Sequence, residues 1–127
     1  MAFRKLEPLC DKIGAEQIRA VIEEFYRRLS ADPRIGHHFE RIEDFEDHVR
    51  RISDFWYQNL GGRLEQPPTI DMVGKHAPLR LTEDDLQAWM EHFRATTDEM
   101  LDPAHAKEWQ QLAEGIASRM RQDILTG

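Results

Sequence analysis

The sequence predicts an all-α protein, and two observations lead to that fold class. Apolar side chains recur every three or four residues along four long segments, whereas no stretch alternates apolar and polar residues as a strand does. Glycines and prolines are few and fall mostly between these segments, where helices end. The chain has 127 residues, which is long enough to bury a core without disulfides or zinc. We therefore expect a single domain over residues 1–127, in which the helices pack around one core.

The first two helices are expected over residues 15–31 and 43–60. Asp32-Pro33 ends the first helix, because a residue before proline disfavours helical torsion angles, and a short turn over 34–39 follows. Gly61 and Gly62 predict a C-terminal cap with a positive φ for the second helix. The stripes on which these helices would pack contain Ile18, Ile22, Phe25 and Leu29 in the first and Phe45, His48, Ile52, Phe55 and Asn59 in the second.

The third helix is expected to open at Thr82, which can cap it, and acidic residues fill its first turn, where the helix dipole favours negative charge. Asp102 and Pro103 predict the start of the fourth helix as a cap and a first-turn proline. Their stripes contain Leu86, Trp89, Met90, Phe93, Thr97 and Met100 in the third and Trp109, Leu112, Ala113, Ile116, Met120 and Ile124 in the fourth. A long irregular linker, residues 63–81, joins the second and third helices, and linkers of this length usually carry function or are disordered.

The charge and cysteine content exclude several classes of partner and setting. The net charge is −7 and the pI is near 5.3, so the chain lacks the positive field that gathers phosphates, and we expect neither nucleic acid nor a membrane as a partner. Cys10 is the only cysteine, which rules out an intrachain disulfide and favours the reducing cytoplasm. No apolar run is long enough for a signal peptide or a membrane span.

Three polar side chains lie on or beside the apolar stripes of three different helices: Tyr26, His48 and Trp89. Each can be an ordinary core residue whose polar tip bonds a backbone carbonyl, or the three tips can converge on one cavity that takes a small polar ligand. His76 stands among apolar neighbours in the long linker, either as an exposed loop histidine or as a metal ligand beside a large flat group, as a haem iron requires. Zinc and di-iron sites fit less well, because the chain lacks clustered Cys and His and repeated Glu-x-x-His pairs.

Six short motifs occur in order over roughly residues 15–125. They are Phe25-Tyr26-Arg27-Arg28-Leu29, Ile35-Gly36-His37-His38-Phe39, Asp47-His48, Ser53-Asp54-Phe55-Trp56, Lys75-His76-Ala77-Pro78-Leu79 and Leu86-Gln87-Ala88-Trp89-Met90-Glu91-His92-Phe93. In order and approximate spacing, the set resembles the truncated haemoglobins, and specifically their third group. The length of the chain suits this abridged form of globin, and the glycine motifs prominent in the other truncated groups are not evident.

The resemblance implies a globin-like all-α fold, an abridged two-over-two helical sandwich around haem b. It also implies that His76 is the proximal iron ligand and therefore the metal site. The remaining pocket residues are implied to be Tyr26, His48 and Trp89 on the ligand side of the iron, Phe39 against the porphyrin, and Phe55 and Trp56 along the walls.

A haem protein of this kind is implied to bind dioxygen and other diatomic gases, among them carbon monoxide and nitric oxide. Several hydrogen-bond donors around the ligand hold dioxygen tightly or polarise its O–O bond, which favours ligand chemistry or sensing over bulk oxygen transport. Nitric-oxide dioxygenase and peroxidase-like activity are therefore candidate reactions, and either needs an external reductase, because the sequence holds no flavin or nicotinamide site. The alternative is a haem-free helical interaction module whose aromatic stripes are ordinary core.

Overall fold

The computed structural model describes residues 8–40, 42–64 and 81–122, and the described parts are helical with short connections. The elements in chain order are α1 (Leu9–Ile13), α2 (Ala15–Ala31), the 3-10 helix η1 (Gly36–Phe39), α3 (Phe45–Asn59), α5 (Glu83–Met100) and α6 (Pro103–Met120). The expected first helix is confirmed at both ends, and α3 begins two residues later and ends one residue earlier than expected. His76 and most of the expected linker lie outside the described residues, as does Ile124.

Capping side chains fix where three of the long helices begin. Asp44 accepts the backbone N–H of Asp47 at 3.1 Å before α3. Thr82 accepts the N–H of Asp85 at 3.1 Å before α5, and the Asp85 carboxylate accepts the Thr82 N–H at 2.9 Å in return, which forms a capping box. Asp102 caps α6 in the same manner, so the starts expected at Thr82 and Asp102 are confirmed.

The short helix α1 was not predicted, because five residues are too few to show a helical period. It is held at the end of α3, where the Cys10 N–H donates to the Leu60 carbonyl at 3.0 Å. The next residue, Gly61, has a φ of +102°, so the predicted positive-φ cap is confirmed. A Cβ placed on Gly61 would lie 2.7 Å from the Cβ of Pro8, so the residue before α1 closely approaches the end of α3.

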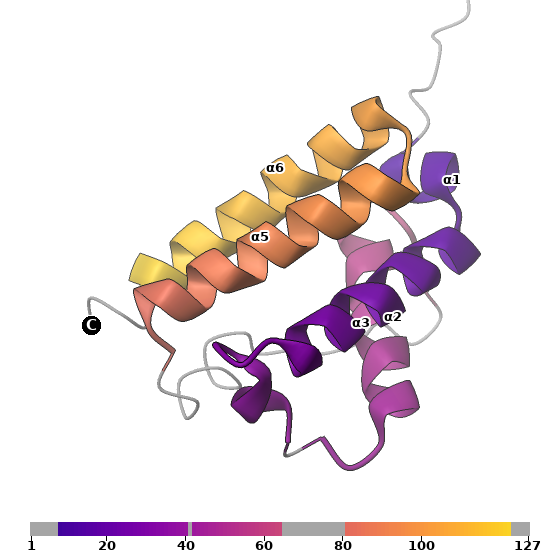
Figure 1. Ribbon diagram of the computed structural model, residues 1–127. Helices are drawn as coiled ribbons and strands as arrows, with labels where there is room; N and C mark the ends of the chain where they lie inside the picture. The colour runs from indigo at the N-terminus through magenta and orange to yellow at the C-terminus, as the bar shows by residue number, and fades with distance from the viewer. Residues whose placement is uncertain (1–7, 41, 65–80, 123–127) are drawn as a thin grey trace, which may run out of the picture.

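The long helices form two pairs, as Figure 1 shows. Helices α5 and α6 lie side by side and antiparallel, joined by a connection of two residues, and α2 and α3 form the other pair. Helix α2 packs against both α3 and α5, so it lies at the centre of the arrangement. The Gln17 side chain on α2 donates to the Met100 carbonyl at 3.1 Å, which ties the start of α2 to the end of α5.

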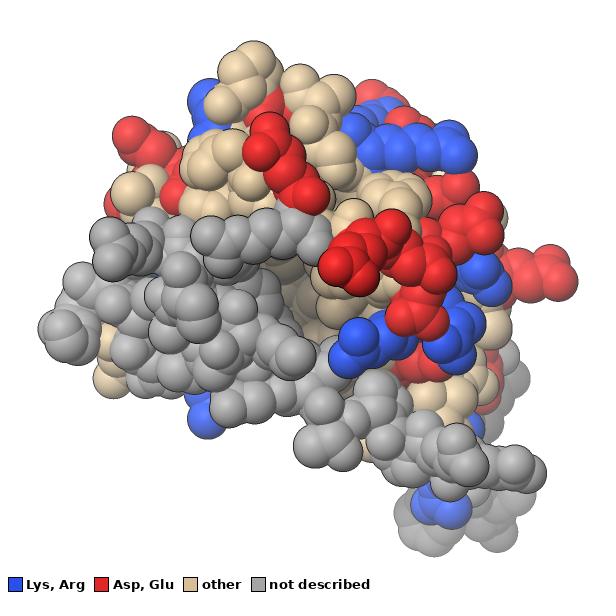
Figure 2. Space-filling view, turned by 90° about the horizontal axis from the view of Figure 1, so that it is seen from below, with Lys and Arg blue, Asp and Glu red and all other residues tan. Residues whose placement is uncertain are grey.

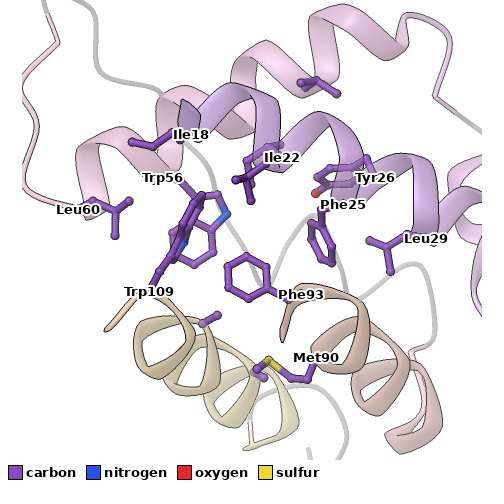
Figure 3. Packing of buried hydrophobic residues seen from close by; sticks show 14 of the residues in the cluster. Ile18, Ile22, Phe25, Tyr26, Leu29, Trp56, Leu60, Met90, Phe93 and Trp109 are labelled. Atoms are coloured by element: carbon purple, nitrogen blue, oxygen red, sulfur yellow. The ribbon is translucent and has the colours of Figure 1, made fainter. Parts of the chain in front are cut away.

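The core between the pairs is largely aromatic. Phe25, Phe93 and Trp109 are fully buried, and Figure 3 shows Phe93 between Phe25 and the two tryptophans Trp56 and Trp109. The Phe93 ring centroid lies 5.2 Å from that of Phe25 and 5.3 Å from that of Trp109, both in edge-to-face geometry. Such contacts add to the free energy that ring burial already supplies. Phe93 therefore links the two helix pairs through one ring.

Charged side chains cover the outside, with both signs interspersed on the described part of the face in Figure 2. Among the arginine–glutamate pairs on this outside, Arg28 pairs with Glu99, Arg94 with Glu114, and Arg121 with Glu83, each between segments distant in the sequence. Exposed pairs contribute little free energy each, so the fold depends on the core. No helix in the described ranges has both the length and the apolar content needed to cross a membrane.

We predict that Phe93→Ala lowers the free energy of unfolding by about 3–5 kcal/mol, because it removes a fully buried ring and leaves a cavity. The control is Leu112→Ala, since Leu112 is 44% exposed and its loss is expected to cost no more than about 0.5 kcal/mol. Urea unfolding followed by circular dichroism measures both. Similar losses for the two variants would contradict the central place assigned to Phe93.

Candidate functional site

Tyr26 lies where α2, η1 and α3 meet, and its side chain is the most buried of the predicted ligand-side residues. Its residue exposure is 8%, and its ring stands edge-on to Phe39 of η1, with centroids 5.6 Å apart, and to His48 of α3 at 4.9 Å. The structure therefore brings together three of the predicted pocket residues from three separate elements. Phe39 and His48 are half-buried, so this group lies at the margin of the core.

The hydroxyl of Tyr26 keeps its proton and can therefore act as a hydrogen-bond donor. Burial raises its pKa well above the ordinary value of a tyrosine, so the hydroxyl remains protonated at any physiological pH. A protonated hydroxyl at this position can donate a hydrogen bond to a polar group placed against it.

Trp89 on α5 belongs to the same aromatic network, although it does not touch Tyr26 directly. Its ring is half-buried and stacks on Phe93, with centroids 5.6 Å apart and planes 8° apart. Phe25 lies between the two donors: its centroid is 5.4 Å from that of Trp89 and 5.4 Å from that of Tyr26. Phe25 thus fixes the relative position of the Tyr26 and Trp89 rings.

Phe55 and Trp56 lie on α3 and contact each other edge-on at 5.5 Å. Trp56 is 3% exposed and packs between Phe93 and Trp109, which places it in the core. Phe55 is half-buried and packs against this core. This position is compatible with the pocket-lining role that the family resemblance implies for Phe55. Trp56 packs against Phe55 from the core.

The predicted metal ligand, His76, lies outside the described residues. Within residues 8–40, 42–64 and 81–122, no group of three or more His, Cys, Asp or Glu side chains is arranged to hold a metal ion. The rings of the neighbouring His37 and His38 have centroids 4.0 Å apart and planes tilted by 40°, and they belong to no such group in these ranges.

Two histidine–carboxylate pairs are present that the sequence did not reveal. His38 Nε2 lies 3.1 Å from Asp85 Oδ2, and His92 Nε2 lies 2.7 Å from Asp32 Oδ2. The partners are 47 and 60 residues apart in the chain, so periodicity within one helix carries no information about them.

Both carboxylates in these pairs are held in the charged form. The Arg34 side chain and then His92 donate to Asp32, and these hydrogen bonds hold the pKa of Asp32 well below its usual range. For Asp85, burial raises the pKa, but the Thr82 N–H and His38 lower it by more, so the net shift is downward.

In the described residues, two helix pairs pack around an aromatic core, with Tyr26, Phe39 and His48 in contact at its margin, and this is the architecture of a globin in an abridged form. The chain belongs to the bacterial-like globin family, whose model matches residues 8–123. The expected truncated-haemoglobin resemblance and the two-over-two fold class are both confirmed.

Individual relatives agree with this assignment. The two-on-two hemoglobin-3 of Arabidopsis thaliana is 26% identical over 104 residues, which cover 74% of this chain and 56% of that protein. The matched part thus spans little more than half the length of this relative.

Two solved structures are also similar. The hemoglobin of the thermophilic phototrophic bacterium Chloroflexus aurantiacus is 25% identical, with a TM-score of 0.79 over 91% of this chain and 98% of that one. The 2/2 hemoglobin of Synechococcus sp. PCC 7002, solved in the cyanomet state with covalently attached heme, is 24% identical, with a TM-score of 0.82 over 95% and 100% of the two chains.

We predict that the lowered pKa of Asp32 makes stability depend on acid pH. A carboxyl whose pKa is lower in the folded state than its ordinary value of 3.8 stabilises the fold above pH 3.8, and this contribution is lost as the pH falls through the folded-state pKa. Asp32→Asn should therefore lose about 1–2 kcal/mol at pH 7, the scale of a hydrogen bond to a charged group, and less at pH 3. Urea unfolding at both pH values measures this, with Asp84→Asn as the control. An equal loss at pH 7 and pH 3 would contradict the assignment.

Proposed function

We propose that this globin binds haem b at the pocket formed by Tyr26, Phe39, His48, Phe55 and Trp89, with His76 as the proximal ligand of the iron. The observation that carries the proposal is the placement of Tyr26, whose buried ring meets the half-buried rings of Phe39 and His48 edge-on where α2, η1 and α3 come together. Membership of the bacterial-like globin family supports the cofactor, and the motif Lys75-His76-Ala77-Pro78-Leu79 supports the ligand.

The residues present fit a flat apolar group with a small polar ligand above it. Phe39, Phe55 and Trp89 are half-buried and packed on the core, so their outer surfaces can be covered by a large ring system. His48 and Tyr26 stand edge-on to each other at 4.9 Å, so a ligand reached by one is near the other.

Haem at this place would supply an iron that can take a diatomic ligand, with His76 as the residue that would hold it. The chain's own residues then decide how firmly the ligand stays. The Tyr26 O–H donates a hydrogen bond to the ligand, the indole N–H of Trp89 is a second donor fixed by ring packing, and His48 is a third donor or a gate. The buried core behind them excludes water from that side.

The ligands that suit these donors are dioxygen first, with carbon monoxide and nitric oxide as less polar alternatives. Two or three donors favour slow release, so we propose ligand chemistry, nitric-oxide dioxygenation or peroxidase-like turnover, in preference to bulk oxygen transport. Sustained turnover then requires an external reductase as a partner. We propose the cytoplasm as the setting, since Cys10 is a free thiol. A haem-free interaction module is the competing function, and a Soret band in the purified protein separates the two.

We predict that His76→Ala loses most of its haem and unfolds at a lower temperature, because a bound cofactor stabilises only the state that binds it. The pyridine haemochrome assay and the Soret absorbance per chain measure the haem content. His105→Ala is the matched control and should retain full haem. Unchanged haem content and an unchanged spectrum in His76→Ala would end the assignment of the proximal ligand.

We predict that Tyr26→Phe speeds dioxygen release by about tenfold to a hundredfold, because a hydrogen bond to a charged or strongly polarised acceptor contributes about 1.5–3 kcal/mol. The substitution keeps the ring contacts with Phe39 and His48 and removes only the hydroxyl. Carbon monoxide carries less charge, so its release should change much less. Stopped-flow displacement of each gas measures both rates.

The matched comparison for this prediction is Trp89→Phe, which keeps a ring on Phe93 and removes the indole N–H. If Trp89→Phe accelerates dioxygen release while Tyr26→Phe leaves it unchanged, Trp89 is the principal donor. If neither variant changes release, the picture of convergent donors is wrong.

A further inference from the structure

The segment from Asp32 to Phe39 is fastened to α5 at two points, and each point joins an imidazole to a carboxylate. At one end, His92 on α5 contacts Asp32 in the segment at 2.7 Å. At the other end, Asp85 on α5 contacts His38 in the segment at 3.1 Å. Figure 1 shows η1 below the N-terminal end of α5, in agreement with the second contact. We call residues 32–39 the fastened segment.

The two pairs lie on either side of Trp89 along α5. Asp85, Trp89 and His92 are separated by four and three residues, so their side chains leave the helix on one face. Arg34 reinforces one end, since its guanidinium donates to Asp32 at 2.8 Å and to Glu91 at 2.9 Å. The helix face that carries Trp89 is thus held to the fastened segment both before and after the indole.

The same segment ends at Phe39, whose ring stands edge-on to Tyr26 at 5.6 Å. One short segment therefore contacts the Tyr26 ring and also holds the helix of Trp89. On the core side, Phe25 joins the same two rings. The separation of the two donors is set from the inside by Phe25 and from the outside by the fastened segment.

The burial of the His38–Asp85 pair makes it costly to break. Both side chains are 9% exposed, and Asp85 also accepts the Thr82 N–H at 2.9 Å. Removing the imidazole leaves a largely buried carboxylate with one donor fewer, and such a loss costs more than an exposed pair would.

We propose that the two His–Asp pairs position Trp89 relative to Tyr26 and thereby set how firmly the pocket holds a polar diatomic ligand. The four paired side chains are positioning residues, because each acts through Trp89 or Phe39 and none is required to hold haem. The part that concerns ligand release rests on the proposed function, whereas the part that concerns the placement of the indole does not.

The first experiment follows the Trp89 indole by ¹⁵N–¹H spectroscopy of the full chain as purified, saturated with carbon monoxide where haem is present. Trp89→Phe assigns the indole signal by its absence. Asp85→Asn and His38→Gln weaken the same pair from opposite sides, and each should shift the Trp89 signal and speed the hydrogen exchange of its N–H. The matched controls are Asp84→Asn and His105→Gln, which change an aspartate and a histidine outside both pairs and should leave the signal in place.

The second experiment measures gas release from the same variants. Dioxygen release should quicken by about threefold to tenfold in Asp85→Asn and in His38→Gln, and carbon monoxide release by less than about twofold, because only the polar ligand senses the donors. The double variant should be no faster than the faster single variant, because both substitutions break one interaction.

Each outcome bears on the proposal. An indole signal that stays unmoved in both pair variants, or that moves equally in the controls, overturns it, as does equal acceleration of the two gases. If Asp85→Asn fails to fold because it also weakens the capping box, His38→Gln keeps the cap and decides the matter. If the protein as purified has no Soret band, the proposed function fails, while the indole shift still tests the positioning.

Discussion

The ring of Phe25 is the contact on which the rest of the structure depends. It is fully buried on α2 and meets three other rings edge-on, those of Tyr26, Trp89 and Phe93, at centroid distances of 5.2–5.4 Å. Edge-to-face contacts have preferred angles, so a ring held on three sides fixes direction as well as distance. The packing that joins the two helix pairs is therefore the same packing that aims the two donors. Phe25 therefore serves both the stability of the fold and the placement of the Tyr26 and Trp89 rings.

Helix α5 carries aromatic packing on one part of its surface and histidine–carboxylate pairs on another. Phe93 faces the core, and Asp85 and His92 face the segment after α2. Aromatic burial resists changes of pH and salt, whereas the carboxylate pairs depend on charge. The pocket margin can thus respond to solution conditions while the core behind it remains rigid.

The helices and caps could be predicted from the sequence because they depend on near neighbours. The stripe from Ile18 to Leu29 predicts α2 at both ends, and Thr82 and Asp102 predict the starts of α5 and α6. Tyr26, Phe39 and His48 were predicted as pocket residues, and the structure places them together. The His–Asp pairs were not predictable, since their partners come from distant segments that meet only after the helices pack. Helix α1 was not predicted because it is local but short: five residues are too few to show a helical period.

The close approach of Gly61 to Pro8 has a consequence for how this chain tolerates change. Two independent constraints act on position 61: a φ of +102°, which excludes most side chains, and a Pro8 Cβ that lies 2.7 Å from where a Cβ would stand. A residue such as asparagine can meet the first constraint but not the second. Position 61 could therefore accept substitution only after the chain before α1 is shortened or rerouted. The two ends of the α1–α3 junction must therefore change together.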